Sequence, residues 1–226
     1  LSLPNVLAVL DVIKLERTYA LITEYADGGN LLELISGDGE EEIKPLDEVT
    51  VRSISSNIAT GLAGLHENKI VHRDIKPQNI LLSYDEDPIC AKISDFGVSA
   101  LIDNNFRVVD SAGTLSYMSP ECLNGIADKS NDLFSAGLIF YEMLTGNHPW
   151  NYNFEDITDQ EEIKTQIILA RKEKPTSPSF YNKHINEQLE KVLLKAISKD
   201  KKDRYKDAKL YLEDLNSYGD VTTTKK

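Results

Sequence analysis

Cysteine is scarce in this sequence, which has two cysteines, Cys90 and Cys122, in 226 residues. Two are too few for a disulfide framework or a cysteine-based zinc site, and such low usage is typical of a reducing compartment. Uninterrupted apolar runs are also missing, since no stretch approaches the roughly 18 residues of a membrane-spanning helix. No signal peptide opens the chain. We therefore expect no membrane span in this segment and a cytoplasmic location.

Positive charge is in deficit as well. The chain has 25 Lys and Arg against 37 Asp and Glu, a net charge of −12. This balance argues against nucleic acid or an anionic membrane as the main partner. The simplest explanation of the acidic composition is solubility. The alternative explanation is that an acidic surface favours basic protein substrates. The 41% hydrophobic and 27% charged content is ordinary for a soluble globular protein, and the length suits one domain, with two small domains as an alternative.

The most informative stretch runs from Val71 to Asn79 and reads Val-His-Arg-Asp-Ile-Lys-Pro-Gln-Asn. It is followed, sixteen residues after Asn79, by Asp95-Phe96-Gly97. Two carboxylates, a lysine and an asparagine in this order are what phosphoryl transfer to a hydroxyl requires. That chemistry needs a positioned acceptor, metal ions on the phosphates and a cation against the developing charge.

Four side chains of these motifs take separate roles in such a reaction. Asp74 is placed to accept or orient the proton of the acceptor hydroxyl, and Lys76 to reach the transferred phosphate. Asn79 and Asp95 supply oxygen ligands for Mg²⁺, which prefers a few carboxylate and amide oxygens together with phosphates.

These motifs resemble the eukaryotic-type (Hanks-type) protein kinase family, whose catalytic loop and magnesium motif read His-Arg-Asp…Asn and Asp-Phe-Gly. Ser119-Pro120-Glu121 adds a third family motif. A lone Asp-Phe-Gly marks an ordinary turn, whereas three motifs in the expected order support one another. The resemblance implies ATP and Mg²⁺ as cofactors. It also implies a mainly α fold: a kinase-like large (C-terminal) lobe, helical with short β-hairpins, plus the last two strands of the small lobe.

The local patterns agree with such a fold. Alternation and β-branched content predict strands over 6–13, 18–23, 80–82 and 89–93. Apolar residues at three- and four-residue spacing, together with capping signals, predict helices over 31–35, 47–66, 161–172, 187–198 and 206–215. A further helix over 131–144 is apolar on nearly every face and ends at Gly146. The stretch 98–117 is polar and predicted to be a loop.

By resemblance the chain divides into three parts: the end of the small lobe up to the hinge (1–25), the large lobe (26–217) and a polar tail or linker (218–226). The backbone of Glu24 and Ala26 then holds adenine and Leu81 floors the pocket. A plain loop and a buried strand leucine are the simpler readings of these residues. The full set of residues expected at the nucleotide and its metal is Glu24, Ala26, Asn30, Lys76, Gln78, Asn79, Leu81 and Asp95.

The acceptor type is also implied by resemblance. Lys76, with Thr114 in the segment that faces the acceptor, is similar to kinases that phosphorylate serine or threonine of proteins. The resemblance therefore implies that Thr114 is a catalytic residue together with Asp74, Lys76 and Asn79. Asn30 and Gln78 stand where arginine-directed kinases carry glutamate, so a preference for upstream arginine is not implied.

The activation segment is similar to that of mitogen-activated protein kinase kinases and bacterial-type Ser/Thr kinases. Three residues before Gly113, where many relatives carry a phosphorylated residue, this chain has Asp110, and Ser111 follows. One hypothesis is that Asp110 supplies a standing negative charge for Arg73. The other is that Ser111 becomes phosphorylated in its place.

Three further residues have expected structural roles. His72 is predicted to be a packed, hydrogen-bonded core histidine. The resemblance implies that Asp132 holds the backbone of the catalytic loop, with a simple helix cap as the alternative. It also implies that Arg204 pairs with Glu121.

The sequence has neither Gly-x-Gly-x-x-Gly nor Val-Ala-x-Lys, the phosphate-covering loop and strand lysine of the family. Because it also begins at Leu1, we expect a piece of a longer protein whose partner is the missing N-terminal lobe, and little activity from this segment alone. A pseudokinase scaffold is one alternative, against which the intact Asp74, Lys76, Asn79 and Asp95 weigh. A small-molecule kinase is another, against which the stretch 114–121 and the helical lobe weigh.

Overall fold

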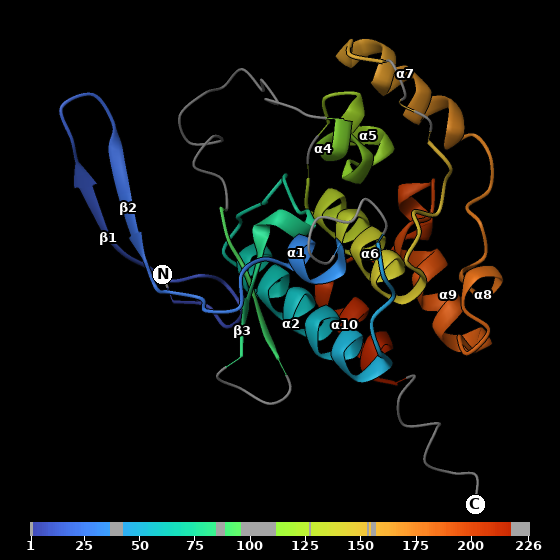
Figure 1. Cartoon of the computed structure of the whole chain (residues 1–226), viewed down its shortest axis with the longest axis horizontal. Coiled ribbons are helices and arrows are strands. Elements are labelled where there is room, and N and C mark those ends of the chain that lie inside the picture. The colour runs from blue at the N-terminus through green and yellow to red at the C-terminus, as the bar shows by residue number, and fades with distance from the viewer. Residues whose placement is uncertain are drawn as a thin grey trace, which may run out of the picture.

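The computed structural model describes residues 2–36, 43–84, 89–95, 112–126, 128–152, 154 and 157–217. They form a helical body with two short hairpins, which confirms the mainly α fold (Figure 1). The helices are α1 (Leu31–Ser36), α2 (Glu48–Glu67), α4 (Ala112–Tyr117), α5 (Pro120–Leu123), α6 (Lys129–Thr145), α7 (Gln160–Ala170), α8 (Pro178–Tyr181), α9 (Glu187–Ala196) and α10 (Ala208–Ser217). Two 3₁₀ turns are η1 (Pro77–Asn79) and η2 (Lys201–Asp203). The strands are β1 (Val9–Lys14), β2 (Tyr19–Thr23), β3 (Ile80–Ser83) and β4 (Cys90–Ile93).

The centre of the body is α6, which is buried on every face from Ser130 to Thr145. A helix that is apolar all round is stable only inside a core, and α2 and α9 pack against it. The approach of α9 depends on Gly137, where an added Cβ would lie 2.6 Å from the Cβ of Ala196. The helix starts at Asp128, whose side chain accepts the Ser130 N–H, and ends at Gly146, which has a φ of 68°.

Helix α2 leads at its C-terminal end into residues 71–79, the expected catalytic loop, which is called the catalytic loop below. Asp47 caps its start by accepting the backbone N–H of Thr50. The predicted apolar stripe, Val51, Ile54, Ile58, Leu62 and Leu65, is buried against α6, α10 and β4. Burial of this stripe fixes where the chain leaves the helix and enters the loop at His72.

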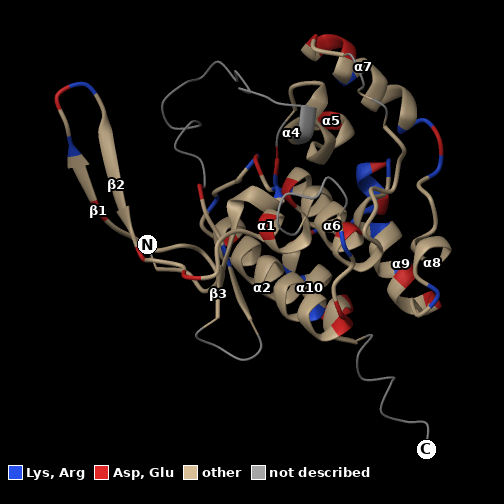
Figure 2. Cartoon of the chain, in the orientation of Figure 1, with Lys and Arg blue, Asp and Glu red and all other residues tan. Residues whose placement is uncertain are grey.

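The two hairpins differ in burial. β3 and β4 pair antiparallel from Ile80–Ile93 to Ser83–Cys90 and lie within the body. β1 and β2 also pair antiparallel, but they project away from the helices with a charged tip at Lys14-Leu15-Glu16-Arg17 (Figure 2). Leu10 and Val12 on this hairpin are 66% and 53% exposed.

The predicted loop over 98–117 is partly wrong, because residues 112–117 form α4. This short helix, together with α5, packs on α7 through a second apolar cluster that includes Leu115, Met118, Ile163 and Ile167. Packing against α7, rather than local propensity, accounts for α4. The short helices α5 and α8 were not predicted either.

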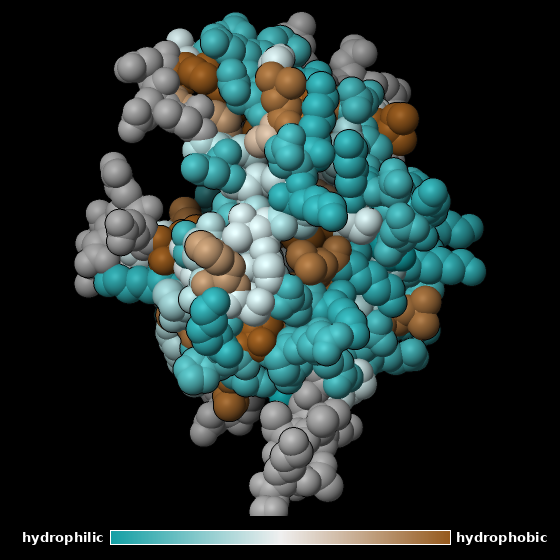
Figure 3. Space-filling model, turned by 90° about the vertical axis from the view of Figure 1, so that its right-hand side faces the viewer, coloured by the Kyte–Doolittle hydropathy of each residue, from teal (hydrophilic) through white to brown (hydrophobic). Residues whose placement is uncertain are grey.

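The surface is mostly hydrophilic on the face that Figure 3 shows. Exposed apolar side chains on α7 and α8 are Leu169 and the adjacent pair Phe180 and Tyr181, whose ring centroids lie 5.2 Å apart. Small exposed apolar groups of this kind are ordinary on protein surfaces. Within the described ranges, no helix combines the length and apolar character needed to cross a bilayer. Cys90 and Cys122 are both buried, and no disulfide joins them.

Candidate active site

Asp132 on α6 holds the catalytic loop by accepting hydrogen bonds from its backbone. Asp132 is fully buried, and its carboxylate accepts the backbone N–H of His72 at 2.9 Å and of Arg73 at 2.8 Å. Arg73 has a φ of 72°, a left-handed conformation that a non-glycine residue keeps only where its surroundings impose it. The expected role of Asp132 is thereby confirmed, and the helix cap proves to be Asp128 instead.

His72 is the packed core histidine that the sequence predicts. It is 2% exposed, its Nε2 lies 2.8 Å from the carbonyl oxygen of Ser94, and its Nδ1 accepts the backbone N–H of Asp74 at 3.2 Å. A neutral imidazole with its proton on Nε2 satisfies both bonds. His72 therefore joins the residue before Asp95 to the backbone of Asp74.

Asp74, Lys76 and Thr114 meet at one point. The Nζ of Lys76 lies 2.9 Å from Oδ2 of Asp74 and 3.1 Å from the hydroxyl oxygen of Thr114. Asn79 donates from Nδ2 to both the carbonyl oxygen and Oδ2 of Asp74, at 2.8 and 2.9 Å. The Asp74 side chain is still 42% exposed, so a partly solvated carboxylate faces outward beside an ammonium group and a hydroxyl.

The hairpin β3–β4 brings Asn79 and Asp95 to neighbouring positions. Ser94 donates from its backbone N–H and from its hydroxyl to the carbonyl oxygen of Asn79, at 2.8 and 3.1 Å. Asp95 follows with an exposed side chain and a φ of 54°. Because the Asn79 amide nitrogen is engaged with Asp74, its amide oxygen is the atom left for a ligand.

This donor set fits Mg²⁺. The ion is held in phosphoryl-transfer sites by one or two protein oxygens, with water and substrate phosphates completing its coordination. Within the described part of the chain, no cluster of three or more His, Cys, Asp or Glu side chains offers a metal site made wholly of protein ligands. Phe96 and Gly97, the rest of the predicted motif, lie outside the described residues.

The expected hinge lies at the base of the projecting hairpin. The backbone N–H of Glu24 donates to the carbonyl oxygen of Ala8 at 3.0 Å, and its carboxylate lies 2.6 Å from Nζ of Lys92. Burial raises the pKa of Glu24, but the hydrogen bonds from Lys92 and from the backbone N–H of Ala8, together with the charge of Lys92, outweigh this effect, so the net pKa falls below its ordinary value. The Glu24 side chain thus pairs with β4.

The residues after the hinge run beside β3. Gly28 donates to the carbonyl oxygen of Leu82, and Leu82 donates to that of Gly29, each at 2.9 Å. Asn30 forms a bridge with Leu81, so the segment after Ala26 lies next to the expected floor of the adenine pocket. The Asn30 side chain itself exchanges hydrogen bonds with Glu33 at the start of α1, as in a capping box.

The remaining expected residues do not all join the central group. Gln78 is exposed on η1, one residue from Asn79. Asp110 and Ser111, which carry the two activation hypotheses, lie outside the described residues. Those hypotheses stay predictions.

The segment 114–121 is joined to α6 by side-chain hydrogen bonds. Ser119 caps α5 by accepting the Cys122 N–H and donates to Asn131 at 2.8 Å. The hydroxyl of Ser135 donates to the carbonyl oxygen of Tyr117 at 2.8 Å. Every one of these partners lies on α6 or α5, so the position of the segment follows from the core helix.

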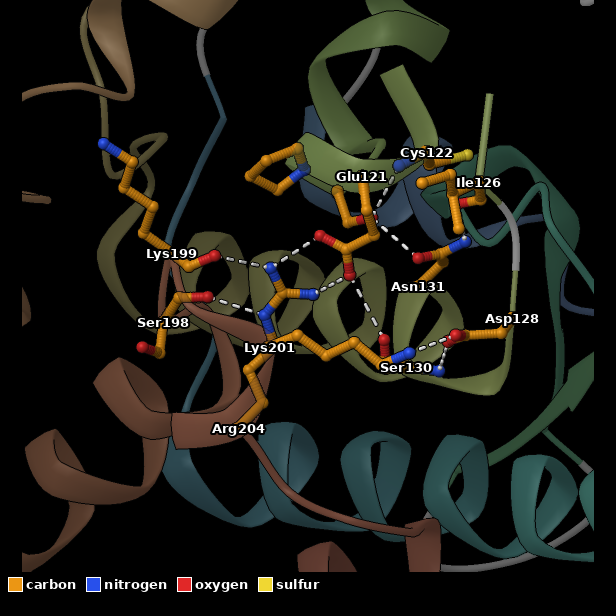
Figure 4. A network of polar contacts seen from close by, with 12 residues as sticks. Glu121, Cys122, Ile126, Asp128, Ser130, Asn131, Ser198, Lys199, Lys201 and Arg204 are labelled. Carbon is orange, nitrogen blue, oxygen red and sulfur yellow. Dashed lines mark hydrogen bonds and ion pairs between the residues drawn. The ribbon is translucent and has the colours of Figure 1, made fainter. Parts of the chain in front are cut away.

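The expected pair of Arg204 and Glu121 is confirmed (Figure 4). Arg204 also donates to the carbonyl oxygens of Ser198 and Lys199, at 2.6 and 3.0 Å, and its guanidinium carbon lies 4.7 Å from the ring centroid of Phe134. Burial raises the pKa of Glu121, yet the hydrogen bond and charge of Arg204 hold it below the ordinary value. This pair ties the end of the segment to the residue that directly follows η2.

Sequence reasoning missed a buried carboxyl group beneath the segment. Glu142, on α6, is 3% exposed, and the hydroxyl of Tyr117 donates to its Oε2 at 2.6 Å. Burial raises the pKa of Glu142 to about 8, against a lowering by the Tyr117 hydrogen bond. A glutamate within an otherwise apolar helix is the signal that could have found it.

Comparison with known proteins identifies one family. Residues 1–214 match the family described as protein kinase domain. Serine/threonine-protein kinase PrkC of Bacillus subtilis (strain 168) is 30% identical over 221 residues, which cover 96% of this chain and 32% of the relative. Serine/threonine-protein kinase PknB of Mycobacterium leprae (strain TN) is 30% identical over 223 residues, with 95% and 33% covered.

A solved structure shares the fold. The crystal structure of Rad53 1–466 in complex with AMP-PNP matches with a TM-score of 0.72 and 26% identity, over 94% of this chain and 50% of that chain. The chain therefore spans half the length of this solved protein. It spans about a third of the length of the two curated kinases named above, namely 32% and 33%.

Proposed function

Because the chain belongs to the protein kinase domain family, we propose that it is the catalytic lobe of an ATP-dependent Ser/Thr protein kinase. In this reaction the γ-phosphoryl group of ATP passes to the hydroxyl of a serine or threonine in a protein. The observation that carries the proposal is the meeting of Asp74, Lys76 and Thr114 within hydrogen-bond distance.

Asp74 orients the acceptor hydroxyl and takes its proton as the new O–P bond forms and the bond to ADP breaks. Its carboxylate is suited to this role because Asn79 and Lys76 hold Oδ2 while the group stays partly exposed. Lys76 places a positive charge where negative charge develops on the transferred phosphoryl group. Thr114 keeps the Lys76 ammonium group in place.

Asn79 and Asp95 would hold Mg²⁺, which supplies charge neutralisation at the ATP phosphates. On the nucleotide side, we assign the backbone of Glu24 and Ala26 to adenine and Leu81 to the floor of its pocket. The bonds that join Gly28 and Gly29 to Leu82 support this assignment, because they keep the hinge beside β3. Asn30 and Gln78 border the same space.

We further propose that the projecting hairpin packs against the rest of a small lobe. Leu10, Val12 and Tyr19 are 66%, 53% and 62% exposed, which is unusual for apolar strand residues unless a partner covers them. The 226 residues contain neither the glycine-rich loop nor the strand lysine of the family. On this proposal, residues 1–25 end the small lobe, 26–217 form the large lobe, and this segment alone has little activity. A cytoplasmic location stays a prediction.

The test is phosphate transfer from ATP labelled at the γ-position, measured on the full-length protein that contains this chain. Generic protein substrates and the protein itself serve as acceptors, and phosphoamino-acid analysis identifies the product. We expect phosphoserine or phosphothreonine that disappears in Asp74→Asn and in Asp95→Asn. A protein that binds ATP yet transfers nothing above these variants would instead be a pseudokinase scaffold. Transfer to a small alcohol but not to protein would indicate a small-molecule kinase.

A further inference from the structure

Arg171 is a buried cation whose position is not predicted by any of the sequence motifs described above. It follows the last residue of α7 and is 3% exposed. Its guanidinium donates to the carbonyl oxygens of Ser116 and Met118 and, from Nε, to the hydroxyl of Tyr152 at 2.8 Å. Among the ion pairs of the described residues, none involves Arg171. Its charge is met by backbone carbonyl groups and a phenol instead.

Three aromatic rings surround this guanidinium. Its central carbon lies 5.1 Å from the ring centroid of Phe134, 5.3 Å from that of Trp150 and 5.9 Å from that of Tyr152. Such contacts favour a cation, more strongly where water is excluded. A buried charge is costly unless its surroundings compensate for it. The rings and the three hydrogen bonds provide this compensation, so the site is specific for a planar, multiply donating cation.

The two carbonyl groups bound by Arg171 belong to the C-terminal end of α4. Ser116 lies in the last turn of this helix and Met118 follows it. Carbonyl groups at a helix C-terminus lack intrahelical partners, and a cation placed there stabilises the end. Arg171 therefore caps α4 from the neighbouring helix α7.

The same short segment touches the catalytic loop at its other end. Thr114 in α4 accepts the hydrogen bond of Lys76 at 3.1 Å. Between the two anchor points, Leu115 packs into the cluster that α7 shares with α4. The distance along the chain from Thr114 to Met118 is four residues, so a shift at the Arg171 end is carried directly to Thr114.

A second arginine holds the continuation of this segment. Arg204 binds Glu121 and lies 4.7 Å from the Phe134 centroid, the same ring that Arg171 contacts. Phe134 thus supports two guanidinium groups, one for residues 116–118 and one for Glu121. The Arg204 contact follows from the family motif, whereas the Arg171 contact does not.

We propose that Arg171 is a positioning residue for the protein acceptor: by capping α4 it fixes segment 114–118, and thereby the place where the acceptor hydroxyl meets Asp74. This inference rests on the proposed kinase function. Its consequence is selective. Transfer to a protein acceptor, which must be seated on segment 114–118, depends strongly on Arg171. ATP hydrolysis to water needs no seated protein and depends on Arg171 less, because the effect reaches it only through the bond of Thr114 to Lys76.

The test uses the full-length protein with Arg171→Met and Arg171→Lys. Methionine keeps an unbranched, apolar side chain without the guanidinium group and its charge, and lysine keeps the charge without the planar fork. Tyr152→Phe removes only the 2.8 Å bond to Arg171. The control is Lys172→Met, an exposed neighbour at the same helix end. Circular dichroism and thermal unfolding establish that each variant is folded.

We expect kcat/KM for a protein acceptor to fall at least tenfold in Arg171→Met and less in Arg171→Lys and Tyr152→Phe. ATP hydrolysis without acceptor should fall clearly less than acceptor phosphorylation in each of the three, because the effect reaches it only through the bond of Thr114 to Lys76. Lys172→Met should change neither rate. Equal losses of both activities would indicate a general structural role and overturn the inference. Unchanged acceptor phosphorylation in folded Arg171→Met would overturn it as well.

A second readout separates this inference from the proposed function. Amide hydrogen exchange at Tyr117, Met118 and Ser119 reports the local opening of the segment without any turnover. We expect at least tenfold faster exchange at these amides in Arg171→Met, with exchange in α2 unchanged. Exchange equal to wild type would refute the capping by Arg171 whatever the activity. A wild-type protein that transfers no phosphate while Arg171→Met exchanges faster would leave the capping intact and refute the kinase function together with the acceptor role.

Discussion

The imidazole Nε2 of His66 lies 2.7 Å from Oδ2 of Asp132, although 66 residues separate them in the sequence. Both side chains are buried, with exposed fractions of 6% and 1%. The same carboxylate accepts two backbone N–H groups of the catalytic loop. His66, at the end of α2, therefore orients the Asp132 carboxylate, which in turn fixes the backbone of the loop at His72 and Arg73.

Removal of this carboxylate should destabilise the fold strongly. In Asp132→Ala, two backbone N–H groups and His66 lose their acceptor in a buried site, and each buried unpaired group costs about 1–3 kcal/mol. We expect the free energy of unfolding to fall by about 3–5 kcal/mol, measured by urea denaturation. His66→Phe, which leaves the two backbone bonds in place, should cost less. Asp128→Ala, which removes only the cap of α6 and a surface ion pair, should cost about 1 kcal/mol. A loss in Asp132→Ala no larger than in Asp128→Ala would contradict the anchoring role.

Glu142 should make stability depend on pH. Burial raises its pKa to about 8, so between about pH 4.5 and 8 the folded state holds a proton that the unfolded state has released. Stability is therefore greatest below this window and falls as pH rises through it. Glu142→Gln keeps the shape and an acceptor for Tyr117 but cannot ionise. We expect the difference in unfolding free energy between this variant and wild type to grow in favour of the variant from pH 5 to pH 8.

The difference between variant and wild type isolates Glu142 from His148. Burial lowers the pKa of His148 to about 3, and this shift has the opposite effect, because stability then rises with pH between about 3 and 6.5. Both proteins keep His148, so its contribution cancels. A difference that stays constant across the window would show that Glu142 is ionised in the folded protein.

The grouping of Asp74, Lys76 and Asn79 could be predicted from the sequence because these residues lie close together in the chain. Asp74, Lys76 and Asn79 fall within six residues, and so short a loop keeps their backbones close together. The long helices α2 and α6 were also predictable, since their apolar patterns extend over several turns. Their ends differ by one or two residues because the caps, such as Asp128, are set by individual side chains.

The segment 114–121 could not be predicted in the same way. Its helix α4 contains glycine, threonine and serine in six residues, a composition with low helix propensity. What stabilises it lies far away in the sequence: Glu142 beneath Tyr117, and Arg171 at its end. Such contacts depend on how α6 and α7 are placed, which no local pattern records.

Thr114 should be needed for its hydroxyl rather than for its shape. Thr114→Val keeps the branched side chain but removes the acceptor that lies 3.1 Å from Nζ of Lys76. We expect transfer to a protein acceptor to fall at least tenfold, while Thr114→Ser, which keeps the hydroxyl, stays within threefold of wild type. The measurement is kcat/KM with the full-length protein. Equal activity in Thr114→Val and Thr114→Ser would exclude a role for the Lys76 bond.

Glu24 should contribute to the hinge through its backbone and not through its carboxylate. The carboxylate pairs with Lys92 at 2.6 Å, with both side chains partly exposed, and such pairs contribute up to about 1 kcal/mol. In Glu24→Gln we therefore expect the KM for ATP to stay within twofold of wild type and the unfolding free energy to fall by at most about 1 kcal/mol. Because the pKa of Glu24 is lowered, this contribution is present above the ordinary pKa of 4.5 and is lost as pH falls below it.

Lys92→Met provides the matched control, because it removes the same ion pair from the other side. The two single variants and the double variant should have nearly equal stability, as expected when one interaction is deleted in three ways. A KM for ATP that rises tenfold in Glu24→Gln but not in Lys92→Met would mean that the carboxylate itself contacts the nucleotide. The adenine contact would then have to be reassigned from the Glu24 backbone to its side chain.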